Sequence, residues 1–265
     1  MATNNKRDFL GVPITLLSRR DAFEELLFWR AIGRCGYVTF VNPHSILMCG
    51  RDVHACSAIT QSHLTVPDGV GIAVAARLLG YGHIERLAGP SLMLDLCDWG
   101  RQSGLRHFFL GGGEGVAASL AERLAHLYPG LQIAGTFCPP FRSVTPEEEA
   151  AIVDRINTAA PDLVWVGLGT GKQERWMAAH VGRLRASALL GVGAAFDFHS
   201  GRVPWAPPWV RLAGFEWAYR LAHEPRRLWR RNVDGFVFLV RVLGQRLGIK
   251  KARIVDPLSG TEISA

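Results

Sequence analysis

Short apolar runs alternate with longer helical patterns along the first 200 residues, and this alternation constrains the fold more than any other feature. The runs are rich in β-branched and aromatic residues, as buried strands are. The expected strands are Tyr37–Val41, Leu64–Val66, Leu105–Leu110, Leu131–Phe137, Leu163–Leu168 and Ala188–Val192, and the expected helices are near 21–32, 44–59, 70–80, 90–103, 115–128, 146–159 and 172–186. This spacing predicts an α/β, Rossmann-like fold, a mainly parallel sheet with helices on both faces.

The alternation stops after Val192. Pro204, Pro207 and Pro208 interrupt the chain, and two more helical patterns follow, near 209–222 and 225–247. A chain of 265 residues can hold one large core with a small appendage. We therefore expect an α/β domain, the catalytic part, over residues 1–200 and a C-terminal helical appendage over residues 201–265.

The appendage carries the whole net charge of the chain. Residues 1–200 hold 18 basic and 18 acidic side chains, whereas residues 201–265 hold 12 basic and 5 acidic ones, which accounts for the net +7. The run 214–232 sets arginines beside tryptophan and tyrosine, and Arg226/Arg227 and Arg230/Arg231 recur four residues apart on one helix face. Arginines beside such rings suit a surface that holds phosphates at a wet, partly apolar boundary.

Three interpretations of this basic segment compete: a solvated helix face, a nucleic-acid surface and an anionic membrane surface. The nearby apolar run Phe236–Val240 favours the membrane. This run is far shorter than the roughly 20 apolar residues that cross a bilayer, so only peripheral association is expected.

The cysteines and the N-terminus indicate the compartment. The five cysteines are scattered without a CxxC pair, which is typical of reduced residues in the cytosol. The first 21 residues show no convincing signal peptide. We expect a cytoplasmic protein at the inner face of the cell membrane.

Four unusual loops follow the predicted strands, at residues 42–44, 67–71, 111–115 and 167–174. Ligands of open parallel sheets bind beyond the carboxyl ends of the strands, so these loops are candidate site segments. Backbone N–H groups at Gly111 and Gly112 could approach a phosphate, although a tight turn explains the glycines equally well. Val116 stands where a dinucleotide fingerprint requires its last glycine.

The segment 167–173 departs from a P-loop in two places. Val166 replaces the first glycine, and Gln173 replaces the Ser or Thr that would hold magnesium. ATP hydrolysis is therefore not expected, and Gln173 is a polar group available to another ligand.

Two aspartates each have an ordinary and a functional interpretation. Asp68 lies in a Pro-Asp-Gly turn, which is common without any function, but a carboxylate at a strand end could also take a proton from a sugar hydroxyl. Asp197 either caps a helix or belongs to the site. The nine histidines form no HxxxH or HExxH pattern and no DxD pair is present, so no metal site is predicted.

Six motifs together are specific where each alone is weak: PDGVG (67–71), RLAG (86–89), LGGG (110–113), GKQE (171–174), GVGAAFDF (191–198) and GFEWAYRLAHEPRRLWRR (214–231). Their order and spacing, from about Gly36 to Arg231, resemble the WecG/TagA/CpsF family of bacterial glycosyltransferases. The resemblance implies inverting, metal-independent transfer, without a cofactor, from a UDP-sugar to a sugar on a polyprenyl (undecaprenyl) pyrophosphate. It places the reaction in cell-surface or exopolysaccharide synthesis.

The resemblance also implies roles for single residues. Asp68 would be the general base that activates the acceptor hydroxyl. The donor and acceptor pocket would be lined by Asn42, Arg86, Gln173 and Asp197, and the pyrophosphates would be gripped by Arg220, Arg227 and Arg230. The family's C-terminal segment is taken to close over the active site and to dock on the membrane.

Three departures from the family pattern bear on the donor sugar. Phe40 replaces the usual Thr two residues before Asn42, Gly171 replaces a Pro, and Trp205 replaces an Arg. N-acetylmannosamine is the family's common donor sugar, and a plain hexose such as glucose is the alternative here.

Two rival functions remain open at this point. A nucleotide-cofactor oxidoreductase would fit the architecture and the glycine loop, and a non-enzymatic membrane- or RNA-binding module would fit the appendage. The favoured partners are a UDP-sugar, a polyprenyl-pyrophosphate-linked sugar, an anionic membrane surface and, as an option, a second copy of the chain, but no nucleic acid.

Overall fold

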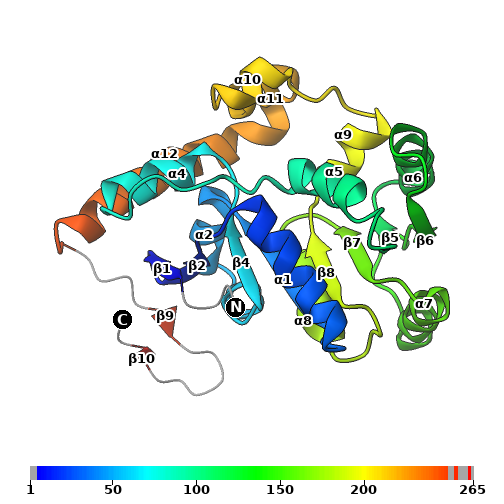
Figure 1. The fold of residues 1–265 in the computed structure, drawn as a ribbon. Helices are drawn as coiled ribbons and strands as arrows, with labels where there is room; N and C mark the ends of the chain where they lie inside the picture. The colour runs from blue at the N-terminus through cyan, green and yellow to red at the C-terminus, as the bar shows by residue number, and fades with distance from the viewer. Residues whose placement is uncertain (1–4, 250–253, 256–261, 264–265) are drawn as a thin grey trace.

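A six-stranded parallel sheet forms the centre of the computed structural model, which describes residues 5–249, 254–255 and 262–263. Its strands are β3 (Gly36–Val41), β4 (Leu64–Pro67), β5 (Arg106–Gly111), β6 (Gln132–Phe137), β7 (Leu163–Gly167) and β8 (Ala188–Gly191). They lie in the order β4-β3-β8-β7-β5-β6, with every neighbouring pair parallel (Figure 1). Each predicted strand is present to within one residue at either end, so the Rossmann-like α/β class is confirmed.

Helices cover both faces of the sheet because successive strand residues point to opposite sides. One face carries α1 (Arg19–Ala31), α5 (Gly89–Trp99), α6 (Val116–Leu127) and α9 (Ala195–Ser200), and the other carries α7 (Pro146–Ala159) and α8 (Lys172–His180). Phe109 and Trp165 pack in the core of the first face. Their strand neighbours Phe108 and Val164 pack in the core of the second.

The single helix predicted over residues 44–59 is wrong, because two helices occupy that stretch. They are α2 (Pro43–Cys49) and α3 (Val53–Thr60). Asp52 separates them by capping α3: its side chain accepts a hydrogen bond from the Ala55 N–H at 2.9 Å. An aspartate in this position competes with a continuous helix.

The helix predicted over 209–222 is also two helices, α10 (Pro208–Leu212) and α11 (Glu216–His223). Gly214 lies between them with a φ of +82°, a left-handed conformation that a helix interior does not accept. The helix predicted over 172–186 ends earlier, at His180.

An N-terminal hairpin was not predicted from the sequence. It pairs β1 (Lys6–Phe9) with β2 (Val12–Thr15) through Leu10 and Gly11, whose φ angles of 56° and 87° are both positive, as a two-residue hairpin turn requires. Its strands are four residues long, too short to show a clear alternation. Helix α9 was missed as well. A second pair of short strands, β9 (Ile254–Val255) and β10 (Glu262–Ile263), is antiparallel.

The helix α12 (Pro225–Arg246) lies alongside α4 (Val70–Leu78) and packs on α2, as Figure 1 shows for α4. Phe238 and Val242 of α12 are fully buried in a core that includes the hairpin, α2 and α4. Near its end, the Gln245 amide accepts a hydrogen bond from the Leu10 N–H at 3.1 Å and donates one to Asp8 at 2.8 Å. Within the described part of the chain, no helix has an apolar stretch long enough to cross a bilayer.

Candidate active site

A cavity of about 730 Å³ opens beyond the carboxyl ends of β3, β4 and β8. Its opposite wall comes from α10, α11 and α12. Five of the residues predicted for the site line it: Asn42, Asp68, Arg86, Gln173 and Arg220. The appendage therefore completes the cavity that the sheet begins.

Asn42 and Asp68 are neighbours because β3 and β4 are paired and parallel. Val41 lies opposite Pro67, and the Asp68 N–H donates to the Val41 carbonyl at 2.8 Å. The Asn42 side chain caps α2 by accepting hydrogen bonds from the N–H groups of His44 and Ser45, at 3.1 and 3.2 Å. These bonds fix the orientation of the Asn42 amide in the cavity wall.

The carboxyl group of Asp68 has an environment suited to proton transfer. Burial, followed by the nearby carboxylate of Glu216, raises the pKa of Asp68 to about 6, although the guanidinium groups of Arg231, Arg220 and Arg86 act in the opposite direction. A carboxylate with a pKa close to the working pH is an effective general base.

Gln173 is a buried cavity residue with an unpaired acceptor. Its Nε2 group donates to the Gly191 carbonyl at 2.8 Å and to Glu174 Oε1 at 3.0 Å. The opposite atom, Oε1, is buried without a partner among the described residues. A buried acceptor of this kind is usually satisfied, so a ligand N–H or O–H group is the expected partner.

Gly171 stands where the family pattern has a proline. It has a φ of +85°, which proline cannot adopt, and its N–H donates to the Glu174 carboxylate at 2.5 Å. Burial raises the pKa of Glu174. The backbone at this position is therefore one that a proline could not adopt.

Positive charge exceeds negative charge in the cavity wall. Five arginines and two acids are among its lining residues: Arg19, Arg86, Arg211, Arg220 and Arg231 against Asp68 and Glu216. The first of these arginines is paired, since Arg19 contacts Glu85 at 2.9 Å and Asp95 at 2.8 Å outside the cavity lining. The remaining excess of guanidinium groups favours an anionic ligand.

Arg86 and Arg220 have further structural contacts. The Arg86 guanidinium donates to the carbonyls of Arg211 and Leu212 at 3.2 and 3.3 Å, which ties the end of α10 to the body of the molecule. Arg220 lies over the Phe198 ring at 5.1 Å, and its Nε is buried with no hydrogen-bond partner in the described segments.

The other predicted residues lie outside the cavity lining. The loop glycines pack against β7: the Gly112 N–H donates to the Gly167 carbonyl at 3.0 Å, and a Cβ on Gly111 would lie 2.5 Å from that oxygen. The Asp197 carboxylate is 3.9 Å from the Arg202 guanidinium. The contacts of Gly111 and Gly112 with Gly167 therefore give a packing reason for glycine at these two positions.

The two remaining arginines of the predicted set are exposed. Arg227 pairs with Glu224 at 2.5 Å, and Arg230 lies over the Trp229 ring at 5.3 Å. The next residue, Arg231, is the one that lines the cavity. A periodicity signal was available, because Leu228, Asp234, Phe238 and Val242 are the buried residues of α12 and recur at helical spacing.

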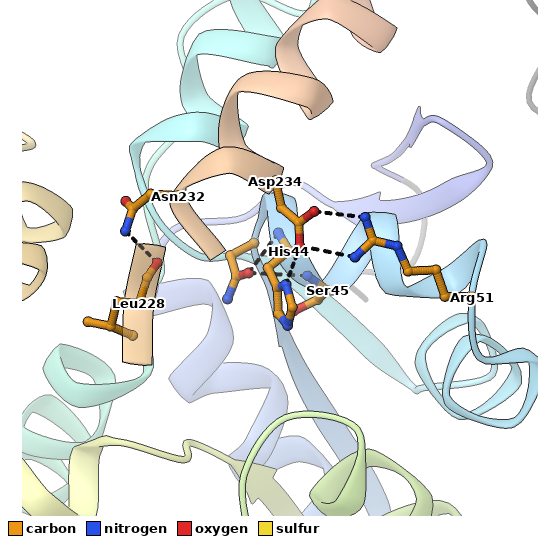
Figure 2. A network of polar contacts seen from close by, with 7 residues as sticks. His44, Ser45, Arg51, Leu228, Asn232 and Asp234 are labelled. Carbon is orange, nitrogen blue, oxygen red and sulfur yellow. Dashed lines mark hydrogen bonds and ion pairs between the residues drawn. The ribbon is translucent and has the colours of Figure 1, made fainter. Parts of the chain in front are cut away.

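A polar cluster beside the cavity, shown in Figure 2, was also not predicted. The Asp234 carboxylate of α12 contacts His44 Nδ1 at 2.6 Å and accepts hydrogen bonds from the Arg51 guanidinium at 2.8 and 3.3 Å. Asp234 is 6% exposed, and His44 is itself a cavity residue. No local pattern reveals a contact between residues 190 positions apart.

The cavity lies at the carboxyl edge of a parallel sheet and contains an aspartate with a raised pKa and more guanidinium groups than carboxylates. This combination is typical of an enzyme that acts on an anionic substrate. The comparison with family models makes the class specific. The model of the glycosyl transferase WecG/TagA/CpsF family matches residues 7–252, so the chain belongs to that family.

Named relatives share the similarity. The chain is 31% identical over 207 residues to an N-acetylglucosaminyldiphosphoundecaprenol N-acetyl-beta-D-mannosaminyltransferase of Bacillus spizizenii. The aligned region covers 78% of each of the two proteins. Proteins of the same name from Bacillus subtilis and Staphylococcus aureus are 27% and 25% identical, over 88% and 94% of this chain and 88% and 96% of theirs.

Proposed function

We propose that this glycosyltransferase moves a hexose-type sugar, with inversion and without a metal, from a UDP-sugar to a sugar on a polyprenyl diphosphate. The observation that carries the proposal is the cavity, which combines the Asp68 carboxylate, with a pKa of about 6, and unpaired guanidinium groups. The relatives' names supply the acceptor class, a diphosphoundecaprenol-linked sugar.

The proposed reaction is a single displacement. Asp68 takes the proton of the acceptor hydroxyl while that oxygen forms a bond to the anomeric carbon of the donor. The bond from this carbon to the diphosphate oxygen breaks on the opposite face, and its electron pair leaves with the diphosphate. One carboxylate is enough, because no covalent sugar–enzyme intermediate is formed. Arg86 and Arg220 stabilise the charge of the diphosphates.

The remaining residues are assigned by position. Asn42 and Gln173 contact polar groups of the substrates inside the cavity, where both side chains lie. Gly111, Gly112, Asp197, Arg227 and Arg230 are outside its lining, so their substrate-binding roles stay predictions. They would apply to parts of the substrates that extend beyond the cavity.

Phe40 bears on the donor sugar. It is 6% exposed and lines the cavity, where the family pattern has a hydroxyl group. Trp205, the other apolar replacement, stacks on the Arg211 guanidinium at 3.6 Å. The relatives' names favour N-acetylmannosamine, and the loss of polar groups at these positions favours a plain hexose such as glucose.

The appendage supports an anionic membrane as a further partner, at the cytoplasmic face. Large apolar side chains stand exposed along its helices, among them Trp209, Leu212, Phe215, Trp229 and Phe236. Arginines lie on the same helices. Apolar and cationic groups together are what a peripheral helix needs to bind an anionic bilayer surface.

A panel of UDP-sugars tests the proposal. The protein is incubated in EDTA with each donor, including UDP-glucose and UDP-N-acetylmannosamine, and with a lipid diphosphate that carries a sugar. We expect one donor to give UDP and a glycosylated lipid, and Asp68→Ala to lower the rate on the order of 10²- to 10⁴-fold. Asp154→Ala, which removes an exposed carboxylate of α7, is the matched control. Consumption of no donor, or near-normal turnover by Asp68→Ala, would contradict the proposal.

A further inference from the structure

Arg231 differs from the other arginines at the start of α12. Arg226, Arg227 and Arg230 are exposed, whereas Arg231 lines the cavity. Burial, followed by repulsion from Arg220, lowers the pKa of Arg231, and Asp68 acts in the opposite direction. Among the described residues, Arg231 has neither a hydrogen-bond nor a salt-bridge partner. Its half-buried guanidinium faces the cavity without a partner, so it is available to bind an anion there.

The polar cluster of Figure 2 fixes the helix face that carries Arg231. Asp234 is three residues further along α12, so the two side chains lie on the same side of the helix. Asp234 is the single acid of α12 and is held by two groups of the body, His44 and Arg51. We call these three residues the clamp.

No other polar anchor described for α12 lies near the cavity. In the described segments, the side chains of α12 that bond to the body are Asp234, Gln245 and Arg246, and the last two contact the hairpin and the end of α4. They lie more than two helical turns beyond Asp234. The clamp is therefore the polar contact with the body that holds α12 nearest to Arg231, alongside the packing of buried apolar residues such as Leu228.

We infer that His44, Arg51 and Asp234 are positioning residues that hold Arg231 as a diphosphate-binding group of the cavity. The inference rests on the proposed function, which supplies two diphosphates: that of the nucleotide donor and that of the lipid-linked acceptor. Both present the same chemistry to a guanidinium, two negatively charged phosphates that accept bidentate hydrogen bonds.

Ligand binding in EDTA tests the inference without any need for turnover. Calorimetry gives dissociation constants for inorganic pyrophosphate, UDP, farnesyl diphosphate and uridine. We expect Arg231→Gln to weaken pyrophosphate about 10- to 100-fold and to leave uridine unchanged, because the loss is that of charge-assisted hydrogen bonds to phosphate. Arg241→Ala, which removes an exposed guanidinium from the same helix, is the control and should bind as the wild type does.

A double-mutant cycle separates positioning from general structural damage. Asp234→Asn should raise the dissociation constant for pyrophosphate about 10-fold, because displacing a binding group by about 1 Å weakens its contacts with the ligand. In the Arg231→Gln background, the same substitution should have no further effect. Losses that multiply would overturn the clamp. Arg51→Gln, which removes a largely exposed arm of the clamp, should act in the same direction and covers the case in which Asp234→Asn does not fold.

The ligands distinguish this inference from the proposed function. If Arg231→Gln weakens the binding of UDP, Arg231 binds the diphosphate of the donor. If it weakens the binding of farnesyl diphosphate instead, Arg231 binds the diphosphate of the acceptor. Binding of pyrophosphate but not of UDP would support the clamp and contradict the UDP-sugar donor. If Arg231→Gln changes the binding of none of pyrophosphate, UDP and farnesyl diphosphate while UDP still binds, the clamp is overturned and the UDP-sugar donor is kept. Failure of the wild type to bind pyrophosphate, or wild-type binding by both clamp variants, would overturn the inference.

Discussion

Asp68 is the residue at which opposing electrostatic effects meet. Burial and Glu216 favour the neutral acid, and three arginines favour the carboxylate. Because the first effect dominates, the pKa in the folded protein is about 6, above the ordinary 3.8. The proposed base is therefore deprotonated at neutral pH and becomes protonated in mild acid. Turnover should fall as the pH is lowered through about 6, which a pH–rate profile would show.

The same shift predicts how Asp68 affects stability. A raised pKa means that folding favours the protonated acid, so its stabilising contribution is complete below about pH 4 and is lost as the pH rises through about 6. Asp68→Asn should therefore raise the melting temperature, relative to the wild type, more at pH 8 than at pH 5. Differential scanning calorimetry at the two pH values measures this. A variant that is less stable than the wild type at pH 8 would contradict the account.

Cavity residues that follow strands were predictable, whereas of the charged cavity residues in the appendage only Arg220 was predicted, through the family resemblance. Asn42, Asp68 and Gln173 follow strands whose apolar runs are clear, so sheet topology brings them together. Arg231 depends on which face of α12 is buried. His44 and Asp234 meet only because residues 190 positions apart come together, which no local pattern encodes.

At the scale of elements, α12 has two distinct sides. Phe238 is fully buried against the hairpin, α2 and α4, whereas Phe236, two residues earlier, is 71% exposed. The strands were predictable because β-branched runs alternate with helices. The hairpin was not, because its strands are only four residues long and their apolar side chains pack against elements distant in the sequence, β4 and α3 among them.

The two phenylalanines give a matched test of this packing. Phe238→Ala should lower the free energy of unfolding by about 3–5 kcal/mol, because it leaves a cavity in the core between α12 and the hairpin. Phe236→Ala should change it by less than about 0.5 kcal/mol, since that ring is in solvent. Urea denaturation measures both. Equal losses would mean that α12 does not pack in solution as it does here.

At the scale of the molecule, charge and apolar exposure coincide. Residues 1–200 are neutral in sum, and the basic appendage closes the cavity. Its helices also expose large apolar groups, of which Leu212 and Phe236 line the cavity and Trp209 and Trp229 lie outside it. A substrate whose diphosphate lies in the cavity and whose lipid lies in a bilayer would be reached by such an arrangement. The appendage would then serve both catalysis and membrane binding.

Vesicle sedimentation tests the membrane part of this arrangement. The full chain should sediment with anionic vesicles at 0.1 M salt and be released at 1 M salt, because the Debye length falls from about 10 Å to about 3 Å. Phe236→Ser should weaken binding, since it removes a 71% exposed apolar side chain of α12 that stands in the lining of the cavity. Phe141→Ser removes an 85% exposed ring outside the appendage and should leave binding unchanged. Equal sedimentation with neutral vesicles at high salt would exclude an electrostatic anchor, and equal losses in both variants would place the membrane contact elsewhere.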